Sequence, residues 1–486
     1  MQLSDIKLFS SEIILIIGSI VILLHGIFYT NSEESNKRIF QVTLISLISS
    51  LYFTAYVVDS GTNSFNNLLN NDLYTLFFKI LVISGTIIIS YISYNYLKDL
   101  NIVKPEFFFL ILISLVGILV LISSRNIISM YIGLELQSIC LYILASYRKY
   151  DIKSSESGVK YFIIGALSSG ILLYGLSIIY AFTNSTDFYE ISKSINISKE
   201  NNVNFLILNI GFVLILCGLF FKIAVVPFHM WAPDVYEGSP TSITAFFTTI
   251  PKIGAIAFLI KFLNIPFENY SNAWFQILYL VAIASMILGS IAAVNQTNIK
   301  RLLAYSSINH MGFILIGILT ASQTGIKSVQ LYITIYIVNI LGIFTCILCL
   351  KNKINGYYLE NIKSFSGLNK KNSFLSFSFA ILFFSLAGLP PLAGFFGKLY
   401  ILISAVENKL YFLAIIAILT TIISAFYYLK IIKIIFFDKP VNNIYTNITA
   451  ISKAIIVIIL IISVFFILFI SDFLEIINAT SIIINT

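Results

Sequence analysis

The chain has 486 residues, of which 58% are hydrophobic and 11% are charged, and its formal net charge is +8. Water-soluble globular proteins carry about 25% charged residues, so this composition excludes a soluble globular fold and predicts a protein that uses lipid as its solvent. The basic residues are scattered singly through short loops, which excludes a nucleic-acid-binding patch. Heavy use of Ile, Asn, Phe, Tyr and Lys is typical of an AT-rich genome, as in an organelle or a reduced bacterium.

Apolar runs of the length that a membrane-spanning helix needs recur along the whole chain. Such a helix requires about 20 mainly apolar residues, and about fourteen runs reach this length. The first run is predicted to be a retained helix, because it lacks the basic leader and the small-residue cleavage pattern of a signal peptide. The expected spans lie near residues 11–29, 39–58, 74–94, 106–122, 126–146, 157–182, 205–225, 241–263, 274–294, 301–320, 328–350, 374–402, 410–436 and 450–476.

The distribution of basic residues between the loops predicts the orientation of the chain. An even number of spans places both termini on one side of the membrane. Eighteen lysines and arginines fall in loops after odd-numbered helices, and seven fall on the opposite side. Because basic loops stay on the cytoplasmic side, both termini are expected on the positive-potential side.

Four ionisable residues are expected deep inside predicted spans, where each costs about 2.5–3.5 kcal/mol on insertion scales. They are Glu135, Lys222, Lys252 and Lys398. Such residues usually line ion or proton paths, whereas an amine that snorkels to the interface is the preferred interpretation for Lys79 and Lys453. A buried lysine can exchange protons near cellular pH because desolvation lowers the pKa of an amine, while a neighbouring carboxylate raises it.

Prolines interrupt two predicted spans close to these lysines. Pro227 follows Lys222 by five residues, and the pair Pro390–Pro391 precedes Lys398 by seven. Proline removes a backbone hydrogen bond from a helix. Irregular backbone at membrane depth is tolerated only where it lines protein or a water-filled cavity, and broken helices beside charges are typical of transport sites near the midplane.

The spacing of the buried residues predicts an internal repeat. Lys222 and Lys398 lie 176 residues apart, and Glu135 and His310 lie 175 residues apart. The same shift carries predicted helices four to eight onto nine to thirteen, and a repeat of five helices must be inverted relative to its neighbour. A lone buried histidine is more often a hydrogen-bonded core residue. Because His310 takes the place of Glu135 in the second repeat, it is nevertheless expected in the proton path.

The predicted fold is therefore an all-α polytopic membrane protein with two inverted five-helix repeats, in which helices seven and twelve are broken. Residues 1–105 are expected to hold three N-terminal helices, and residues 106–263 the first repeat, helices four to eight. Residues 264–436 hold the second repeat, helices nine to thirteen, and residues 437–486 hold helix fourteen.

Motifs for a cofactor or metal are missing from the sequence. There is no G-x-G-x-x-G segment after a strand and no Walker A segment. Cys346 and Cys349 form a C-x-x-C pair, but a structural zinc site would need a second pair or a histidine cluster. We expect no metal and no cofactor in this chain, and any redox group must lie in another subunit.

The chain closely resembles a known family in two segments, FHMWAPDVYEGSPTSITAFFTTIPKIGA at residues 228–255 and LAGLPPLAGFFGKLYI at residues 386–401. This family comprises the antiporter-like membrane subunit of respiratory complex I, NADH:ubiquinone oxidoreductase, that is called N in bacteria and chain 2 in mitochondria. The similarity extends through nearly the whole chain, including MYIGLELQSICLYIL and NIKRLLAYSSINHMGFILIG.

The resemblance implies a membrane-arm subunit that translocates protons while quinone is reduced elsewhere. Glu135, Lys222, Lys252 and Lys398 resemble the charged residues of the family on the fifth, broken seventh, eighth and broken twelfth helices. His310 resembles a polar position on the tenth helix, in the hydrophilic axis of the membrane arm. FMN, iron–sulfur clusters and ubiquinone are expected in partner subunits, which include neighbouring antiporter-like subunits in the same bilayer.

Alternatives stay open on three points. The main functional alternative is a cation/proton antiporter subunit of the Mrp type, and the second is a scaffold whose buried charges only hold helices together. Asp234 and Glu237 either belong to a solvated loop that caps the next helix or take part in proton entry. The expected location is the mitochondrial inner membrane, with the bacterial inner membrane as the alternative.

Overall fold

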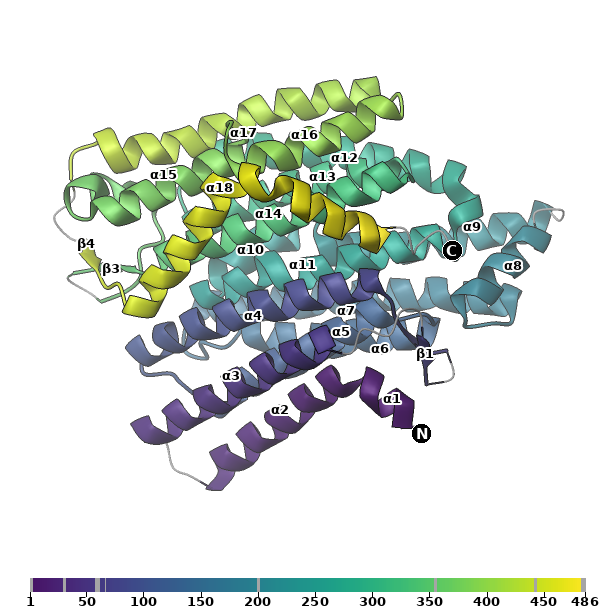
Figure 1. The fold of residues 1–486 in the computed structure, drawn as a ribbon, viewed down its shortest axis with the longest axis horizontal. Helices are drawn as coiled ribbons and strands as arrows, with labels where there is room; N and C mark the ends of the chain where they lie inside the picture. The colour runs from purple at the N-terminus through teal and green to yellow at the C-terminus, as the bar shows by residue number, and fades with distance from the viewer. Residues whose placement is uncertain are drawn as a thin grey trace. The chain divides into compact units, whose positions relative to one another are not determined.

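The computed structural model describes residues 3–28, 32–56, 62–65, 67–198, 202–353, 356–440 and 444–481. Most of these residues are helical, and Figure 1 shows the order of the elements. The α-helices are α1 (Leu3–Leu8), α2 (Ser10–Phe28), α3 (Glu33–Tyr56), α4 (Leu73–Asp99), α5 (Pro105–Ser123), α6 (Ile127–Ala145), α7 (Ile152–Thr183), α8 (Phe188–Ser198), α9 (Asn202–Ile223), α10 (Trp231–Gly238), α11 (Thr241–Asn264), α12 (Ser271–Val294), α13 (Ile299–Leu319), α14 (Gln323–Ile347), α15 (Ser373–Ala387), α16 (Ala393–Glu407), α17 (Tyr411–Phe437) and α18 (Ala450–Ser481).

Short strands and 3₁₀ helices lie in the connections between these helices. Strand β1 (Thr62–Ser64) pairs antiparallel with β2 (Leu69–Asn71), and β3 (Leu350–Asn352) pairs antiparallel with β4 (Ile444–Thr446). The 3₁₀ helices are η1 (Glu268–Tyr270), η2 (Ile362–Phe365) and η3 (Leu368–Lys370).

Thirteen of the described helices are long and apolar enough to cross a membrane. They are α2 to α7, α9, α11 to α14, α17 and α18. Helices α15 and α16, with 15 residues each, are too short to cross alone, and together they occupy the run predicted at residues 374–402. Each predicted run thus corresponds to one long helix or to this interrupted pair. The predicted class, an all-α multi-pass membrane protein, is confirmed.

Polar side chains fix the points at which several helices begin. The Asp72 carboxylate accepts a hydrogen bond from the Thr75 backbone N–H, and the Thr75 hydroxyl accepts one from the Asp72 backbone N–H, so the two residues form a capping box for α4. Asn126, Asn298 and Ser322 cap α6, α13 and α14 through their side-chain oxygens. These caps satisfy amides that lack partners within the helix, so the sequence sets these helix starts locally.

Contacts within the chain define two compact units. Unit 1 consists of Met1–Ile223, Gly238–Trp274 and Ala479–Thr486. Within it, α7 packs against α9, α5 against α6, and α4 against α11. Helices α5 and α6 approach closely, because a Cβ added at Gly117 would lie 2.8 Å from the Gly133 carbonyl oxygen. Along α11 every residue from Thr241 to Leu263 is buried, so a charge on this helix is removed from water.

Unit 2 consists of Ala224–Glu237 and Phe275–Asn478. Within it, α14 packs against α13, α15 and α16, while α17 packs against α15 and α16. Helix α12 lies close to α13, because a Cβ added at Gly289 would lie 2.6 Å from the Asn309 backbone nitrogen. The two units are defined by contacts within the structure, whereas the boundaries predicted at residues 105, 263 and 436 are defined by the repeat in the sequence. Those boundaries, and the inversion of the second repeat, stay predictions.

Candidate functional site

Lys222 is held by two serine hydroxyl groups in unit 1. It lies in the last turn of α9 and is 7% exposed. Its Nζ donates hydrogen bonds to Ser138 Oγ on α6 at 2.6 Å and to Ser169 Oγ on α7 at 3.5 Å. The Ser138 hydroxyl in turn donates to the Leu134 carbonyl, which leaves its lone pairs directed at the amine. Three helices therefore meet at one buried amine.

Glu135 lies one helical turn before Ser138 on α6. In the part of the chain that the structure describes, no ion pair joins Glu135 to Lys222, although the negative charge of Glu135 acts on Lys222 over a longer distance. Ser138 is thus the direct contact. Because opposite charges removed from water are expected to compensate each other, we predict from the sequence that Glu135 approaches Lys222 directly or through one water, and this stays a prediction.

The chain is non-helical between α9 and α10, over residues 224–230. The Val226–Pro227 peptide bond in this segment is cis. The Val226 N–H donates a hydrogen bond to Ser285 Oγ on α12 at 3.0 Å. The break that the sequence predicts near Pro227 is therefore present, and a serine satisfies one of the amides that it exposes.

Arg301, at the start of α13, anchors α10 within unit 2. Its Nη1 donates to Asp234 Oδ1 at 2.9 Å and to Glu237 Oε2 at 3.1 Å. The three side chains are 33%, 37% and 25% exposed, so the ion pairs are partly solvated. Asp234 lies in the first turn of α10, where a negative charge is favourable. Both carboxylates therefore have a structural contact, and their part in proton entry stays a hypothesis.

Lys252 lies in the middle of α11, directly after Pro251, and is 2% exposed. Its neighbours along the helix are buried as well. A proton can reach this amine only through the interior of the protein. From the sequence we expect Lys252 to link the two halves as a bridging proton site, and this role stays a prediction.

The second break lies between α15 and α16 in unit 2, which Figure 1 shows as separate helices. Gly388 follows α15 with a φ of +88°, and the Pro390–Pro391 peptide bond is cis. Lys398 on α16 is 6% exposed, and its Nζ donates to the Ala387 carbonyl oxygen at 2.9 Å. This carbonyl lies at the C-terminal end of α15, where the helix dipole favours a positive charge. The predicted break is present, and the amine of Lys398 binds the carbonyl oxygen at its start.

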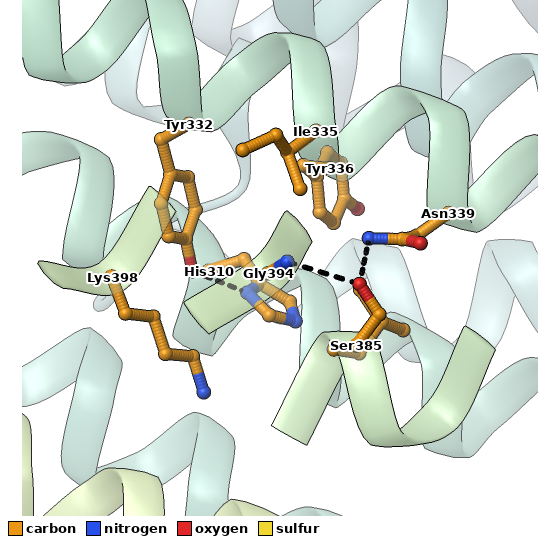
Figure 2. Close-up of a pocket in the computed structure, with 9 residues that line it drawn as sticks. His310, Tyr332, Ile335, Tyr336, Asn339, Ser385, Gly394 and Lys398 are labelled. Atoms are coloured by element: carbon orange, nitrogen blue, oxygen red, sulfur yellow. Dashed lines mark hydrogen bonds between the residues drawn. The ribbon is translucent and has the colours of Figure 1, made fainter. Parts of the chain in front are cut away.

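The Ser385 hydroxyl stabilises this break through two hydrogen bonds. Its Oγ accepts hydrogen bonds from the Gly394 N–H at 3.0 Å and from Asn339 Nδ2 at 2.9 Å (Figure 2). The Asn339 Oδ1 accepts one from Ser463 Oγ on α18 at 3.1 Å. Helices α14, α15, α16 and α18 are therefore joined by one polar network next to Lys398.

His310 connects α13 with two tyrosine hydroxyl groups. Its Nδ1 lies 2.6 Å from the Tyr332 hydroxyl on α14, and its Nε2 lies 3.0 Å from the Tyr428 hydroxyl on α17. A neutral imidazole donates through one nitrogen and accepts through the other. The Tyr428 hydroxyl also forms a hydrogen bond with Ser306, so the chain of hydrogen-bonding groups continues beyond the ring.

His310 and Lys398 line one cavity in unit 2 (Figure 2). The volume open to water within it is about 10 Å³, and Tyr332, Tyr336 and Asn339 also line it. This volume corresponds to about one water molecule. The structure thus brings together two of the predicted site residues, from α13 and α16, around one small cavity.

Sequence reasoning missed part of the buried charge in unit 1. Lys79, interpreted as snorkelling to the interface, is 1% exposed and donates to Glu12 Oε1 at 2.8 Å. That interpretation is wrong, because the amine turns inward between α2 and α4. Lys261, which lies near the end of the span expected at residues 241–263 and is counted with the basic residues of the adjoining loop, is 2% exposed on α11. Each lies within two turns of a helix end, where hydropathy cannot distinguish an interface position from a buried one.

Comparisons with known proteins agree on one family. The family model described as "NADH:quinone oxidoreductase/Mrp antiporter, TM" matches residues 124–424, more than half of the chain. The NADH-quinone oxidoreductase subunit N of Pelagibacter ubique is 48% identical over 428 residues, which cover 88% of this chain and 89% of that protein. The chain belongs to the NADH:quinone oxidoreductase/Mrp antiporter family.

Solved structures of the NADH:quinone oxidoreductase/Mrp antiporter type share the fold. A chain of respiratory complex I from Thermus thermophilus with bound aureothin is 27% identical, with a TM-score of 0.81 over 96% of this chain and 99% of that chain. A chain of the Mrp complex from Dietzia sp. DQ12-45-1b has a TM-score of 0.85 over 100% of this chain and 98% of that chain. Its identity is 17%, so this second likeness concerns the fold alone.

Proposed function

We propose that this chain is a proton-translocating membrane-arm subunit of NADH:quinone oxidoreductase, complex I, of the subunit N type. The identity of 48% with a relative named NADH-quinone oxidoreductase subunit N supports the assignment to this complex. The observation that carries the proton function is the cavity lined by His310 and Lys398 beside a helix break. Imidazole and a desolvated amine can both exchange protons near neutral pH.

In unit 1, Lys222 carries the proton, two serines hold it, and Glu135 controls its charge. A hydroxyl group accepts a hydrogen bond from an ammonium and can donate one to a neutral amine, so Ser138 and Ser169 suit both states of Lys222. The attraction between opposite charges falls with distance. Movement or protonation of Glu135 therefore changes how firmly Lys222 holds its proton.

In unit 2, His310 passes the proton between two hydroxyl groups. One tautomer of the ring donates to Tyr332 and accepts from Tyr428, and the other tautomer does the reverse. Lys398 receives the proton through the cavity and holds it against the Ala387 carbonyl. In unit 1, Lys252, which is buried in the middle of α11, binds the proton in a further step. One elementary charge moved against 100 mV requires about 2.3 kcal/mol, which quinone reduction in partner subunits supplies.

The chain performs no redox chemistry under this proposal. FMN, iron–sulfur clusters and ubiquinone are bound by partner subunits of the complex, and neighbouring antiporter-like subunits adjoin this chain in the membrane. Because the relative from Pelagibacter ubique is bacterial, we favour the bacterial inner membrane over the mitochondrial one. The distribution of basic residues supports placing both termini on the positive-potential side.

The Mrp-type antiporter remains the second candidate function, because the fold is shared at a TM-score of 0.85. An identity of 17% carries no argument beyond the fold, whereas 48% identity with subunit N favours complex I. Purification of the native complex tests the choice. We expect flavin and iron–sulfur clusters to copurify with the chain, and Lys222→Ala to abolish pumping while NADH oxidation by an artificial acceptor continues. Sodium or potassium exchange by a preparation without redox subunits would contradict the proposal.

A further inference from the structure

A second group of buried charges lies in unit 1, where α2 and α4 begin. Glu12 is 0% exposed and Lys79 is 1% exposed. The Lys79 Nζ donates to Glu12 Oε1 at 2.8 Å and to Asn71 Oδ1 at 2.9 Å. The Ser11 hydroxyl donates to Glu12 Oε2 at 2.6 Å. Both carboxylate oxygens are therefore occupied, and the Lys79 amine has a charged and a neutral partner.

Lys261 adds a third buried ionisable group to this end of unit 1. It lies in the last turn of α11, is 2% exposed, and its Nζ has no hydrogen-bond partner among the described residues. The Tyr74 hydroxyl donates to the Ala257 carbonyl at 2.9 Å, and Ala257 lies one helical turn before Lys261. This bond fixes the end of α11 against the start of α4, which carries Lys79.

The charges that act on Lys261 come from different elements packed around it. They are those of Asp72 at the start of α4, Lys79 on α4, and Arg125 between α5 and α6. Arg125 itself pairs with Asp187 at 3.4 Å, and these two side chains are 18% and 16% exposed. Unlike Glu12 and Lys79, the Arg125–Asp187 ion pair near this group is therefore partly solvated.

The three buried groups differ in how their protons are fixed. A charge taken out of water costs several kcal/mol unless an opposite charge and hydrogen bonds compensate. Lys79 and Glu12 compensate each other at 2.8 Å and bind further polar groups. Lys261 has no such bond in the described structure. Of the three groups, Lys261 is therefore the one that can bind and release a proton without breaking a hydrogen bond or ion pair of the described structure.

We propose that Glu12, Lys79 and Lys261 form a second proton-binding site in unit 1, at which Lys261 binds and releases a proton delivered by water. The Glu12–Lys79 pair fixes the charge beside that amine. This site uses α2, α4 and α11, whereas Lys222 is bound by α6 and α7. The inference rests on the proposed proton translocation, to which it adds a binding step.

Lys261→Met in the intact complex is the first test, because methionine keeps a long unbranched side chain and removes the amine. We expect unchanged assembly and unchanged NADH oxidation by an artificial acceptor. Proton pumping and coupled quinone reduction should fall about tenfold, less than for a usual general acid or base, because water can also carry the proton. Lys453→Met removes an exposed lysine of α18 and should leave all four readouts unchanged.

The double variant Glu12→Gln with Lys79→Met separates a proton role from a structural role. Joint replacement of a buried ion pair is often neutral for stability, whereas loss of one partner leaves a buried unpaired charge. We expect the double variant to assemble normally, to pump as poorly as Lys261→Met, and to show the same altered pH profile of quinone reduction. Normal pumping and a normal pH profile in an assembled Lys261→Met complex would overturn the proposal.

Two further variants make the outcome unambiguous. Lys261→Gln covers the case in which methionine prevents assembly, because normal pumping by an assembled glutamine variant equally refutes the second site. Lys222→Ala in the same assay distinguishes failure of the second proton-binding site from failure of the proposed proton translocation. Lost pumping in Lys222→Ala with normal pumping in Lys261→Met refutes only the second site, and normal pumping in both refutes proton translocation through this chain as well.

Discussion

Gly388→Ala perturbs the amine of Lys398 without replacing any ionisable residue. Gly388 has a φ of +88° directly after α15, and a Cβ added there would lie 2.9 Å from Lys398 Cδ and 3.5 Å from its Nζ. Two non-bonded carbon atoms do not approach this closely, so the flexible lysine side chain must move. We expect this movement to disrupt its hydrogen bond to the Ala387 carbonyl, which is 2.9 Å long.

The magnitude follows from two separate costs. A residue other than glycine in this backbone conformation costs about 1–3 kcal/mol of stability. Loss of a hydrogen bond that involves a charged group costs about 1.5–3 kcal/mol, which corresponds to about a tenfold to hundredfold slower step. The first cost lowers the amount of folded protein, and only the second lowers the rate of proton transfer per assembled complex.

Gly356→Ala is the matched control for the backbone cost. Gly356 has a φ of +68°, and a Cβ added there meets no atom within 4 Å. The assay is proton pumping by purified complex in vesicles, normalised to the amount of complex by NADH oxidation with an artificial acceptor. We expect Gly388→Ala to pump about tenfold more slowly and Gly356→Ala to pump normally. Equal pumping per complex in both variants would refute the assignment of the Lys398 amine to the break.

Three further substitutions test other contacts. Ser138→Ala removes the shorter hydrogen bond of Lys222, which is 2.6 Å long. We expect quinone-coupled pumping to be about tenfold slower. A normal pumping rate would mean that this hydroxyl does not hold the amine. Tyr428→Phe removes one of the two hydroxyl partners of His310, and stopped-flow pumping should fall while the melting temperature stays nearly constant. Arg301→Gln should lower the free energy of unfolding by about 1 kcal/mol or less, because the ion pairs of Arg301 are partly exposed. Pumping should persist in this variant. Lost pumping at normal stability would instead indicate that the carboxylates of α10 take part in proton entry.

Much of the fold could be predicted because hydropathy and proline act locally. Thirteen apolar runs became single long helices and the run at residues 374–402 became two short ones, since a chain in lipid must satisfy its backbone groups within each segment. The breaks near Pro227 and Pro390–Pro391 followed from the missing amide of proline. Where the irregular backbone finds its partners could not be predicted, because Ser285 and Ser385 are ordinary polar residues in apolar helices until the packing places them at a break.

The candidate site was predictable only for residues that break the apolar pattern strongly. Lys222 and Lys398 stand alone in apolar runs, and their burial is as expected. Their direct partners, two serine hydroxyls and a backbone carbonyl, carry no such signal. Lys79 and Lys261 lie near helix ends, where a charge can equally reach water or turn inward. Only the packing of α4 against α11 and the ion pair of Lys79 with Glu12 on α2 show that both are buried.

Lys222→Arg tests the central claim most directly, because it keeps the positive charge and removes the ability to release a proton. Guanidinium stays protonated throughout the physiological range. The measurement is proton translocation per NADH oxidised by the purified complex in sealed vesicles, together with NADH oxidation by an artificial acceptor. We predict an assembled complex with normal artificial-acceptor activity and with proton translocation and coupled quinone reduction lost. Wild-type translocation by the assembled arginine variant would contradict the assignment of Lys222 as a proton carrier.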